Sequence, residues 1–397
     1  MNQLEIRTST GRRVRSLVTK PLKAIGRWMM RAFCFRAPFP MMFSCFYGYL
    51  FATSAYVVAK LGIPDLLKDG PKSTAELAKL TETDEPTLFR IMRALVSLNV
   101  FDEVDSRVFA LTPLGEMLRS DKPDSLYYWA LHFGEDMLPA MPAMLNQAKT
   151  GEQAFTKAHG MPLWDYLSVD TERGVLWDKK MTVFTEQHVA SIVKAYDFSS
   201  VGLLADVGGG RGALITEILK ANPSVRGILF DRPQVTPEAE ERITQAGLSD
   251  RCSVVSGSFL ECVPPEAEAY IFKHVFHDWD DENVLKILRN CRNVMSEGDK
   301  LFIVEGFVEH DLFGLDEFRR WCDVYQMLCL LGKERTLDEM RELLAKAGFE
   351  MRSLTPTSLM DVSILETVAV SQPQEQPAAA TKTSTPLPAD LATADNK

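Results

Sequence analysis

The chain has 397 residues, of which 46% are hydrophobic and 25% charged, a globular composition long enough for two domains. Its seven cysteines are scattered and form no C-x-x-C pair, so the sequence indicates neither a disulfide framework nor a zinc site. We therefore expect no bound metal and a reducing, cytoplasmic location.

The net charge of -10 is unevenly distributed along the chain. Residues 1–40 contain nine Lys or Arg against the single acid Glu5, whereas the rest of the chain contains 35 basic and 53 acidic side chains. An acidic body disfavours nucleic acid as a partner. Three interpretations of the basic arm stay open: peripheral contact with an anionic membrane surface, a transit sequence, and an arm without a specific role.

No charged residue occurs from Ala37 to Ala59. By length alone this segment would suffice to cross a membrane. However, Pro38 and Pro40 interrupt its start, and several Tyr, Ser and Thr side chains dilute its hydrophobicity. A buried helix that packs against a second subunit explains the same pattern, and we favour that interpretation.

Residues 41–125 have the outline of a winged-helix domain. Ser73 and Glu76 have the spacing of a capping box at the start of a short helix, and a second helix with one apolar face follows. Residues 100–104 and 107–111 then alternate as a small hairpin. Winged helices can bind DNA, but the second helix lacks a basic stripe. We expect a dimerisation domain.

The remaining chain divides into three predicted segments. Residues 126–198 form a mostly helical connection, rich in aromatic and methionine side chains, that contributes to a ligand pocket. Residues 199–370 alternate apolar strands with helices, which predicts an α/β fold with a mainly parallel, Rossmann-like sheet. Residues 371–397 contain four prolines, six alanines and no aromatic residue, so we expect a disordered tail.

The first two predicted strands of the α/β region end in residues suited to a nucleotide-like ligand. One strand leads into a glycine-rich turn, where Gly208 and Gly210 allow the backbone to approach a bound molecule closely. The helix after this turn offers free N–H groups to an anion. The next strand ends at Asp231, which is placed to bind ribose hydroxyls. These features predict an adenosine-containing cofactor, although the glycine spacing also fits a dinucleotide.

Later segments add polar residues to the same edge of the predicted sheet, because ligands bind at the carboxyl ends of strands in open α/β sheets. The residues expected there beside Asp231 are Ser258, Lys273, His277 and Glu305, joined by Glu334 from a later turn. The unperturbed pKa of histidine is close to neutral, which makes His277 the candidate general base. Two carboxylates and a histidine suit proton abstraction.

Five segments resemble, in order, the motifs of a known family: DVGGGRG, LFDRP, FKHVFHDWDDE, LFIVEG and GKERT. Behind a winged-helix region, this set is similar to the S-adenosylmethionine-dependent O-methyltransferases of the caffeate, acetylserotonin and hydroxyneurosporene type, over roughly residues 45–370. The resemblance implies a homodimer, S-adenosylmethionine as cofactor, and a small, largely apolar acceptor with a hydroxyl group.

The resemblance also implies individual roles. His277 would deprotonate the acceptor hydroxyl, which attacks the sulfonium methyl group, and Glu305 and Glu334 would flank the imidazole. Met181 and Trp177 would press on the acceptor ring. The implied cofactor contacts are Gly208, Gly210, Asp231, Ser258, Phe259 and Lys273.

Two positions depart from the family pattern. Ser258 stands where relatives commonly have Asp beside the adenine, and Leu331 stands where many have a glycine before the GKERT turn. Two alternatives therefore stay open beside methyl transfer. One is an enzyme of this fold that uses the bound cofactor for other chemistry, and the other is a winged-helix regulator that binds DNA. The sequence does not identify the acceptor.

Overall fold

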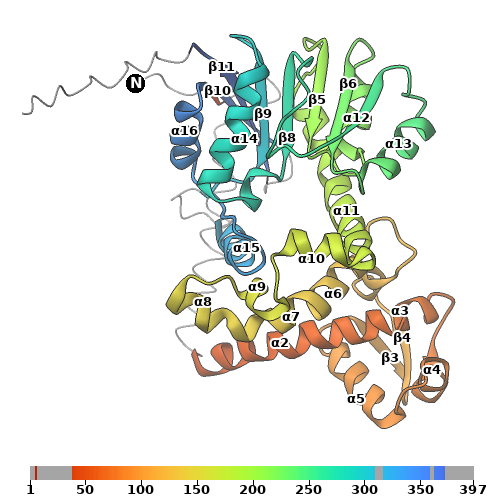
Figure 1. The fold of residues 1–397 in the computed structure, drawn as a ribbon. Helices are drawn as coiled ribbons and strands as arrows, with labels where there is room; N and C mark the ends of the chain where they lie inside the picture. The colour runs from red at the N-terminus through yellow and green to blue at the C-terminus, as the bar shows by residue number, and fades with distance from the viewer. Residues whose placement is uncertain (1–4, 7–37, 309–315, 358–361, 372–397) are drawn as a thin grey trace, which may run out of the picture.

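The computed structural model of the chain describes residues 5–6, 38–308, 316–357 and 362–371. In Figure 1 a helical part lies below a sheet, and the long helix α11 (Thr171–Ala195) runs between them. The predicted basic arm, apart from β1 (Glu5–Ile6) and residues 38–40, and the predicted disordered tail, apart from Ser371, lie outside the described residues.

The main sheet has the strand order β1-β10-β11-β9-β8-β5-β6-β7. Its parallel strands are β5 (Leu203–Val207), β6 (Arg226–Asp231), β7 (Cys252–Ser256), β8 (Ala269–Lys273) and β9 (Lys300–Glu305). Two antiparallel strands follow β9, namely β11 (Ser363–Ala369) and then β10 (Phe349–Pro356), to which β1 pairs in parallel. The predicted mainly parallel, Rossmann-like sheet is confirmed, and the antiparallel pair adds to it.

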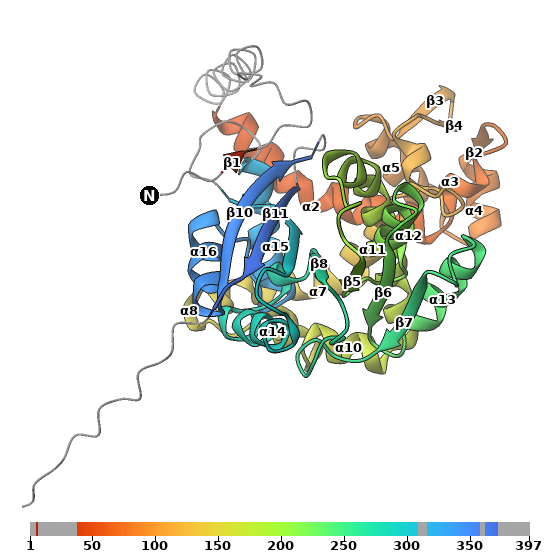
Figure 2. The same ribbon diagram turned by 90° about the horizontal axis from the view of Figure 1, so that it is seen from above.

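Helices cover both faces of this sheet, as Figures 1 and 2 show. On one face lie α14 (Asp281–Val294) and α16 (Leu337–Lys346), and on the other lie α11, α12 (Ala213–Ala221) and α13 (Thr236–Gln245). Strand side chains alternate between the two cores: on β9, Leu301 and Ile303 face the first, and Phe302 and Val304 face the second. Because both faces of the sheet are buried, the sequences of these strands are continuous apolar runs.

The N-terminal domain has the predicted helix, turn, helix and hairpin. Its elements are α3 (Ile63–Leu66), β2 (Lys72–Ser73), α4 (Thr74–Thr81), α5 (Glu85–Val96), β3 (Phe101–Asp105), β4 (Val108–Leu111) and the 3-10 turn η1 (Gly115–Leu118). The capping box forms, because Ser73 Oγ accepts from the Glu76 N–H and the Glu76 carboxylate accepts from the Ser73 N–H. Leu88, Met92 and Leu95 of α5 are buried in the core of this domain.

The uncharged segment that starts near Ala37 forms α2 (Pro38–Lys60), which runs across the lower, helical part of the molecule in Figure 1. In a single chain the first half of α2 exposes large apolar side chains: Phe39, Met42, Phe43, Phe46, Tyr47, Tyr49, Leu50 and Phe51. The first half of α2 is therefore not buried by its own chain, whereas Val58 and Ala59 near its end are buried. None of the helices in the described ranges has the combined length and apolarity that crossing a membrane requires.

The helical connection between the two domains consists of short helices that converge on α11. They are α6 (Tyr127–His132), the π-helical turn η2 (Phe133–Met137), α7 (Leu138–Ala140), η3 (Met141–Ala143), α8 (Met144–Thr150), α9 (Ala154–His159) and α10 (Leu163–Val169). Late in the chain α15 (Asp316–Cys329) returns beneath the sheet, and Leu328 and Cys329 at its end are buried in the same core as Trp177 of α11. The connection and α15 thus face the carboxyl ends of the strands.

Candidate active site

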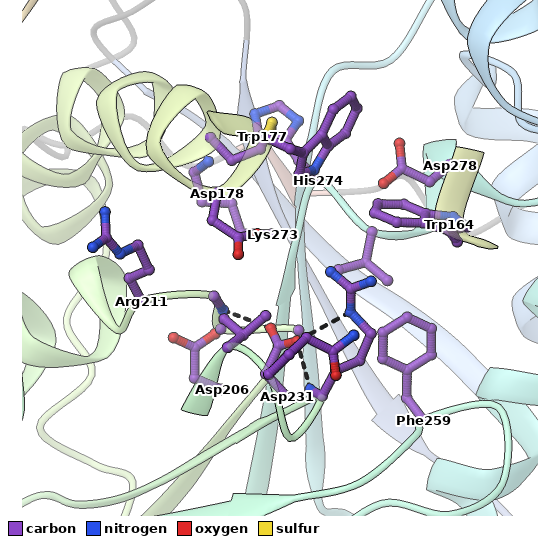
Figure 3. A pocket seen from close by; sticks show the side chains of 18 of the residues that line it. Trp164, Trp177, Asp178, Asp206, Arg211, Asp231, Phe259, Lys273, His274 and Asp278 are labelled. Atoms are coloured by element: carbon purple, nitrogen blue, oxygen red, sulfur yellow. Dashed lines mark hydrogen bonds and ion pairs between the residues drawn. The ribbon is translucent and has the colours of Figure 1, made fainter. Parts of the chain in front are cut away.

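The strand ends open into a cavity of about 440 Å³, called here the large cavity. Figure 3 shows Asp206 and Asp231 on one side of it, with Trp177 and His274 across from them. All residues that the sequence analysis assigned to a cofactor line this cavity: Gly208, Gly210, Asp231, Ser258, Phe259 and Lys273. The fold therefore places in one cavity six positions that strand ends, the glycine turn and the family resemblance had assigned to the cofactor.

Asp231 is held at the end of β6 by backbone donors. Its carboxylate accepts from the Gly210 N–H at 2.7 Å and from the Arg232 N–H at 2.7 Å. Burial raises the pKa of Asp231, and these two hydrogen bonds oppose the change. The carboxylate oxygens have further lone pairs with which to accept hydrogen bonds from a ligand.

The glycine turn leaves space that a side chain would occupy. Gly208 has φ +72°, and a Cβ there would lie 2.8 Å from Cγ2 of Val275. Both the left-handed conformation and the close approach to Val275 exclude larger residues. The turn therefore presents bare backbone to the large cavity, next to the start of α12.

Asp206 is a candidate ligand-binding residue that the sequence analysis did not assign. It is 1% exposed and lines the large cavity, and its Oδ2 has no hydrogen-bond partner among the described residues. Burial, together with the nearby charge of Asp231, raises the pKa of Asp206 to about 7. The sequence feature that could have identified it is its position two residues before Gly208, near the end of β5.

A second cavity of about 90 Å³, the small cavity, adjoins the large one. Four side chains line both cavities: Trp177, Met181, His274 and Asp278. His277 and Glu334 line only the small cavity. Two adjacent cavities with a shared wall suit two ligands that react with each other, with His277 on the side of the second ligand.

His277 and Glu334 form the contact that the sequence hypothesis required. The Nδ1 of His277 lies 2.9 Å from Oε1 of Glu334, and its Nε2 lies 3.5 Å from Oδ1 of Asp278. Burial by itself would lower the pKa of His277, but the carboxylates of Glu334 and Asp278 outweigh it and raise the pKa to about 9. With Nδ1–H assigned as the donor to Glu334, Nε2 is the nitrogen that can exchange a proton.

Glu305 does not lie against the imidazole as the sequence hypothesis had placed it. Its Oε1 accepts instead from the backbone N–H groups of Val275, Phe276 and His277, at 3.1, 2.6 and 3.2 Å. The reason is its position at the end of β9, where the carboxylate lies buried beneath the turn that follows β8. Glu305 therefore holds the backbone of the turn, and Glu334 holds the histidine ring.

The turn that carries Glu334 packs directly against the histidine segment. A Cβ at Gly332 would lie 1.8 Å from the carbonyl oxygen of His277, so only glycine permits this approach. Arg335 is buried and donates to the carbonyl oxygens of Phe276 and Trp279, each at 2.7 Å. Leu331, one of the two departures from the family pattern, is exposed and lines neither cavity.

His274 is a second residue without an assignment from the sequence. It is buried with φ +52°, a left-handed conformation that costs energy in a residue other than glycine. Its ring centroid lies 5.0 Å from that of His277, and neither of its ring nitrogens has a hydrogen-bond partner within the described ranges. Nothing in the local sequence distinguishes it. Over the described residues, no group of His, Cys, Asp or Glu has the arrangement of a metal site.

Comparison with known proteins assigns both domains. Residues 142–350 match the O-methyltransferase domain, and residues 43–121 match the O-methyltransferase dimerisation domain. The chain is 39% identical over 322 residues to phenazine O-methyltransferase PhzM of Lysobacter antibioticus, a match that covers 80% of this chain and 93% of that relative. It is also 32% identical over 345 residues to aclacinomycin 10-hydroxylase RdmB of Streptomyces purpurascens, covering 84% and 90% of the two chains.

One similar solved structure contains both a cofactor and an acceptor. NcsB1, an O-methyltransferase from neocarzinostatin biosynthesis, was crystallised with S-adenosylmethionine and 2-hydroxy-5-methyl naphthoic acid. It matches with a TM-score of 0.72 and 30% identity, over 80% of this chain and 96% of that chain. The resemblance drawn from the sequence is confirmed, and with it the fold and the cofactor. The chain belongs to the S-adenosylmethionine-dependent O-methyltransferases of small metabolites and carries the dimerisation domain of that family.

Proposed function

We propose that the enzyme methylates a hydroxyl group of a small, largely apolar aromatic metabolite, with His277 as general base. The observation that supports this proposal is the ion pair of His277 with Glu334 in the wall of the small cavity, beside the large cavity. Aromatic and apolar side chains complete that wall, among them Trp129, Phe184 and Leu330. Such a lining favours a flat apolar ring.

The residues of the large cavity fit S-adenosylmethionine, which supplies an electrophilic methyl group when bound. Asp231 would accept hydrogen bonds from the ribose hydroxyls, and the bare backbone at Gly208 would lie along the methionyl part. Oδ2 of Asp206, which has no hydrogen-bond partner among the described residues, could accept a hydrogen bond from the ammonium group of the cofactor, whose positive charge would favour the ionised carboxylate. Ser258 and Phe259 would border the adenine, and Lys273, which donates to Thr185 Oγ1, would line the same cavity.

In this proposal the side chains of the small cavity activate and orient the acceptor. Glu334 accepts the Nδ1–H of His277 and so leaves Nε2 to take the proton of the acceptor hydroxyl. The same carboxylate stabilises the imidazolium that results. Trp177 and Met181, in the wall shared by the cavities, would press on the acceptor ring and keep the oxygen in line with the methyl group.

The direct test is a screen of hydroxylated aromatic acceptors with cofactor labelled in its methyl group. We expect the label to appear on an acceptor oxygen. One relative is named aclacinomycin 10-hydroxylase, and this name is the reason to test for chemistry other than methyl transfer. A modified acceptor without label would support that alternative and would contradict our proposal.

Replacing Asp231 with alanine is expected to weaken S-adenosylmethionine binding by about 100-fold or more, because two charge-assisted hydrogen bonds to ribose are lost. Isothermal titration calorimetry measures the affinity directly. The matched control is Asp250→Ala, since Asp250 is exposed and lines neither cavity. Unchanged affinity in a folded Asp231→Ala protein would contradict the assignment of this cavity to the cofactor.

We also propose that the enzyme is a homodimer in which the apolar first half of α2 lies in the interface. The match of residues 43–121 to a dimerisation domain and the exposed aromatic side chains of α2 support this proposal. Burying a phenylalanine side chain stabilises an interface by about 1.5–3 kcal/mol.

Phe46→Glu is expected to shift the enzyme from dimer to monomer in light scattering, because an unpaired carboxylate is costly to bury. Phe46 is 69% exposed in the single chain. Val169→Glu changes a residue of similar exposure, 74%, at the end of α10, and should leave the mass unchanged. A monomeric wild-type protein would refute the proposal, and so would a Phe46→Glu protein that remains dimeric.

A further inference from the structure

Lys180 is a fully buried cation in the wall of the small cavity. Its side chain is 0% exposed, and Nζ lies 3.3 Å from the ring centroid of Trp177 and 4.5 Å from that of Trp129. In the part of the chain that the structure describes, no carboxylate oxygen lies within ion-pair distance of Nζ, whose hydrogen bond goes to the hydroxyl of Tyr325 at 3.2 Å. Burying an ammonium group without a counter-charge is costly.

A chain of hydrogen bonds holds Lys180 in this position. Burial lowers the pKa of His132 to about 4, so its imidazole is neutral and has one donor and one acceptor nitrogen. Nδ1 faces the carboxylate of Asp136 at 2.9 Å and is therefore the donor, and Nε2 accepts from the Tyr325 hydroxyl at 2.7 Å. The Tyr325 oxygen is then free to accept from Lys180.

This chain joins four elements and orients the lysine with specific partners. Asp136 and His132 come from η2 and α6, Tyr325 from α15 and Lys180 from α11. Of the three N–H donors of the ammonium group, Tyr325 takes one. Burial also lowers the pKa of Lys180 to about 7, against the opposing charges of Asp278 and Asp136, so an anion beside Nζ would favour its charged form.

Lys180 lines the same cavity as the residues of α11 that are expected to hold the acceptor. Trp177 and Met181 are three residues before it and one residue after it, and all three side chains line the small cavity. Arg319 lies in the same wall, where its guanidinium group packs over Gly306. The carboxylate of Glu334 is already paired with His277. The small cavity thus contains Lys180 and Arg319 in addition to His277, and its other carboxylate, Asp278, lies 3.5 Å from Nε2 of His277.

We propose that Lys180 binds a carboxylate of the acceptor, so that the preferred acceptor is a hydroxyaromatic acid. This inference deepens the proposed function and rests on it, because it takes the small cavity as the acceptor site. The side chains of Trp177 and Trp129, which line the small cavity, would pack on the apolar ring, and the ammonium group would donate a charge-assisted hydrogen bond to the carboxylate. The hydroxyl of the same ring would face His277.

The test compares each acid with its neutral primary amide: protocatechuic acid with protocatechuamide, and a hydroxynaphthoic acid with its amide. Affinity is measured by calorimetry on the full chain saturated with S-adenosylhomocysteine, and kcat/KM is measured with S-adenosylmethionine. A charge-assisted hydrogen bond is worth about a 10- to 100-fold preference for the acid. We expect Lys180→Met to reduce that preference to within about threefold, chiefly through the KM of the acid.

The matched control is Lys179→Met, which removes the neighbouring charge of α11 outside both cavities and should keep the preference. Cofactor affinity checks folding, since Lys180 does not line the large cavity. Equal affinity of the wild type for acid and amide would overturn the inference, and so would a preference that survives Lys180→Met. In either case, methylation of the amides would leave the proposed function standing. Label transfer to no hydroxylated acceptor at all would overturn both.

Discussion

Replacing His277 with alanine lowers kcat by about 10²- to 10⁴-fold, the usual contribution of a general base. Glu334 lies on the far side of the imidazole and does not replace the lost base. Asp278, the other carboxylate within 4 Å of a ring nitrogen among the described residues, is a weaker base, because burial raises its pKa only to about 6, against about 9 for His277. S-adenosylmethionine affinity should remain within about threefold of wild type, since His277 does not line the large cavity. Single-turnover methyl transfer and calorimetry measure the two effects separately.

The pH dependence of the wild type supplies a second measurement of the same prediction. His277 acts as a base only when neutral, and its neutral population grows as the pH rises through the pKa of about 9. We therefore expect kcat/KM to increase with pH up to about that value. Glu334→Gln removes the carboxylate that raises this pKa most, so the inflection should move to lower pH.

His159→Gln is the matched histidine control, because His159 lines neither cavity. Its kcat and its pH profile should follow the wild type. A His277→Ala enzyme that retains full kcat would contradict the assignment of the base. A wild-type profile that does not change between neutral pH and pH 9 would contradict it as well.

The second large effect is a loss of stability in Glu305→Leu. This change leaves the buried N–H groups of Val275, Phe276 and His277 without their acceptor, and each unsatisfied buried donor costs about 1–3 kcal/mol. We expect the free energy of unfolding to fall by about 3 kcal/mol or more, and Tm to fall by about 6 °C or more. Thermal and denaturant unfolding of the complete chain measure both quantities.

Glu305→Gln is the matched control, because its amide oxygen can still accept from the three N–H groups. It should lose less than half as much stability as Glu305→Leu and should lower the pH inflection less than Glu334→Gln does, because the charge of Glu305 raises the pKa of His277 less than that of Glu334. If Glu305 acted on the imidazole instead, Glu305→Gln would shift the pH profile as strongly as Glu334→Gln. That outcome would contradict a role confined to the backbone.

Several features could be predicted because short-range rules determine them. Ser73 and Glu76 are three residues apart and cap their own helix. The glycine turn after Val207 follows from the conformations that only glycine adopts freely, and Asp231 reaches the large cavity because parallel strands end at one edge of a sheet. Each of these depends on neighbouring residues or on the direction of a strand.

Other features depend on contacts between distant segments. The antiparallel strands β10 and β11 are ordinary strands in the sequence, and their direction follows only from how the chain returns to β9. Lys180 and His274 likewise have no local pattern that separates them from other lysines and histidines. Lys180 is notable only because α6, η2 and α15 bring His132, Asp136 and Tyr325 to it.

The sequence by itself determined the α/β architecture, the family, the cofactor and the candidate base His277, since these depend on motif order and on strand ends. Only the tertiary structure decided which carboxylate holds the imidazole. Glu305 and Glu334 are 28 and 57 residues from His277, and both are acids beside the same turn. Glu305 lies beneath the backbone and Glu334 faces the ring, because β9 and the close packing at Gly332 place them there. Side-chain partners across such separations follow from packing in three dimensions, which no local pattern encodes.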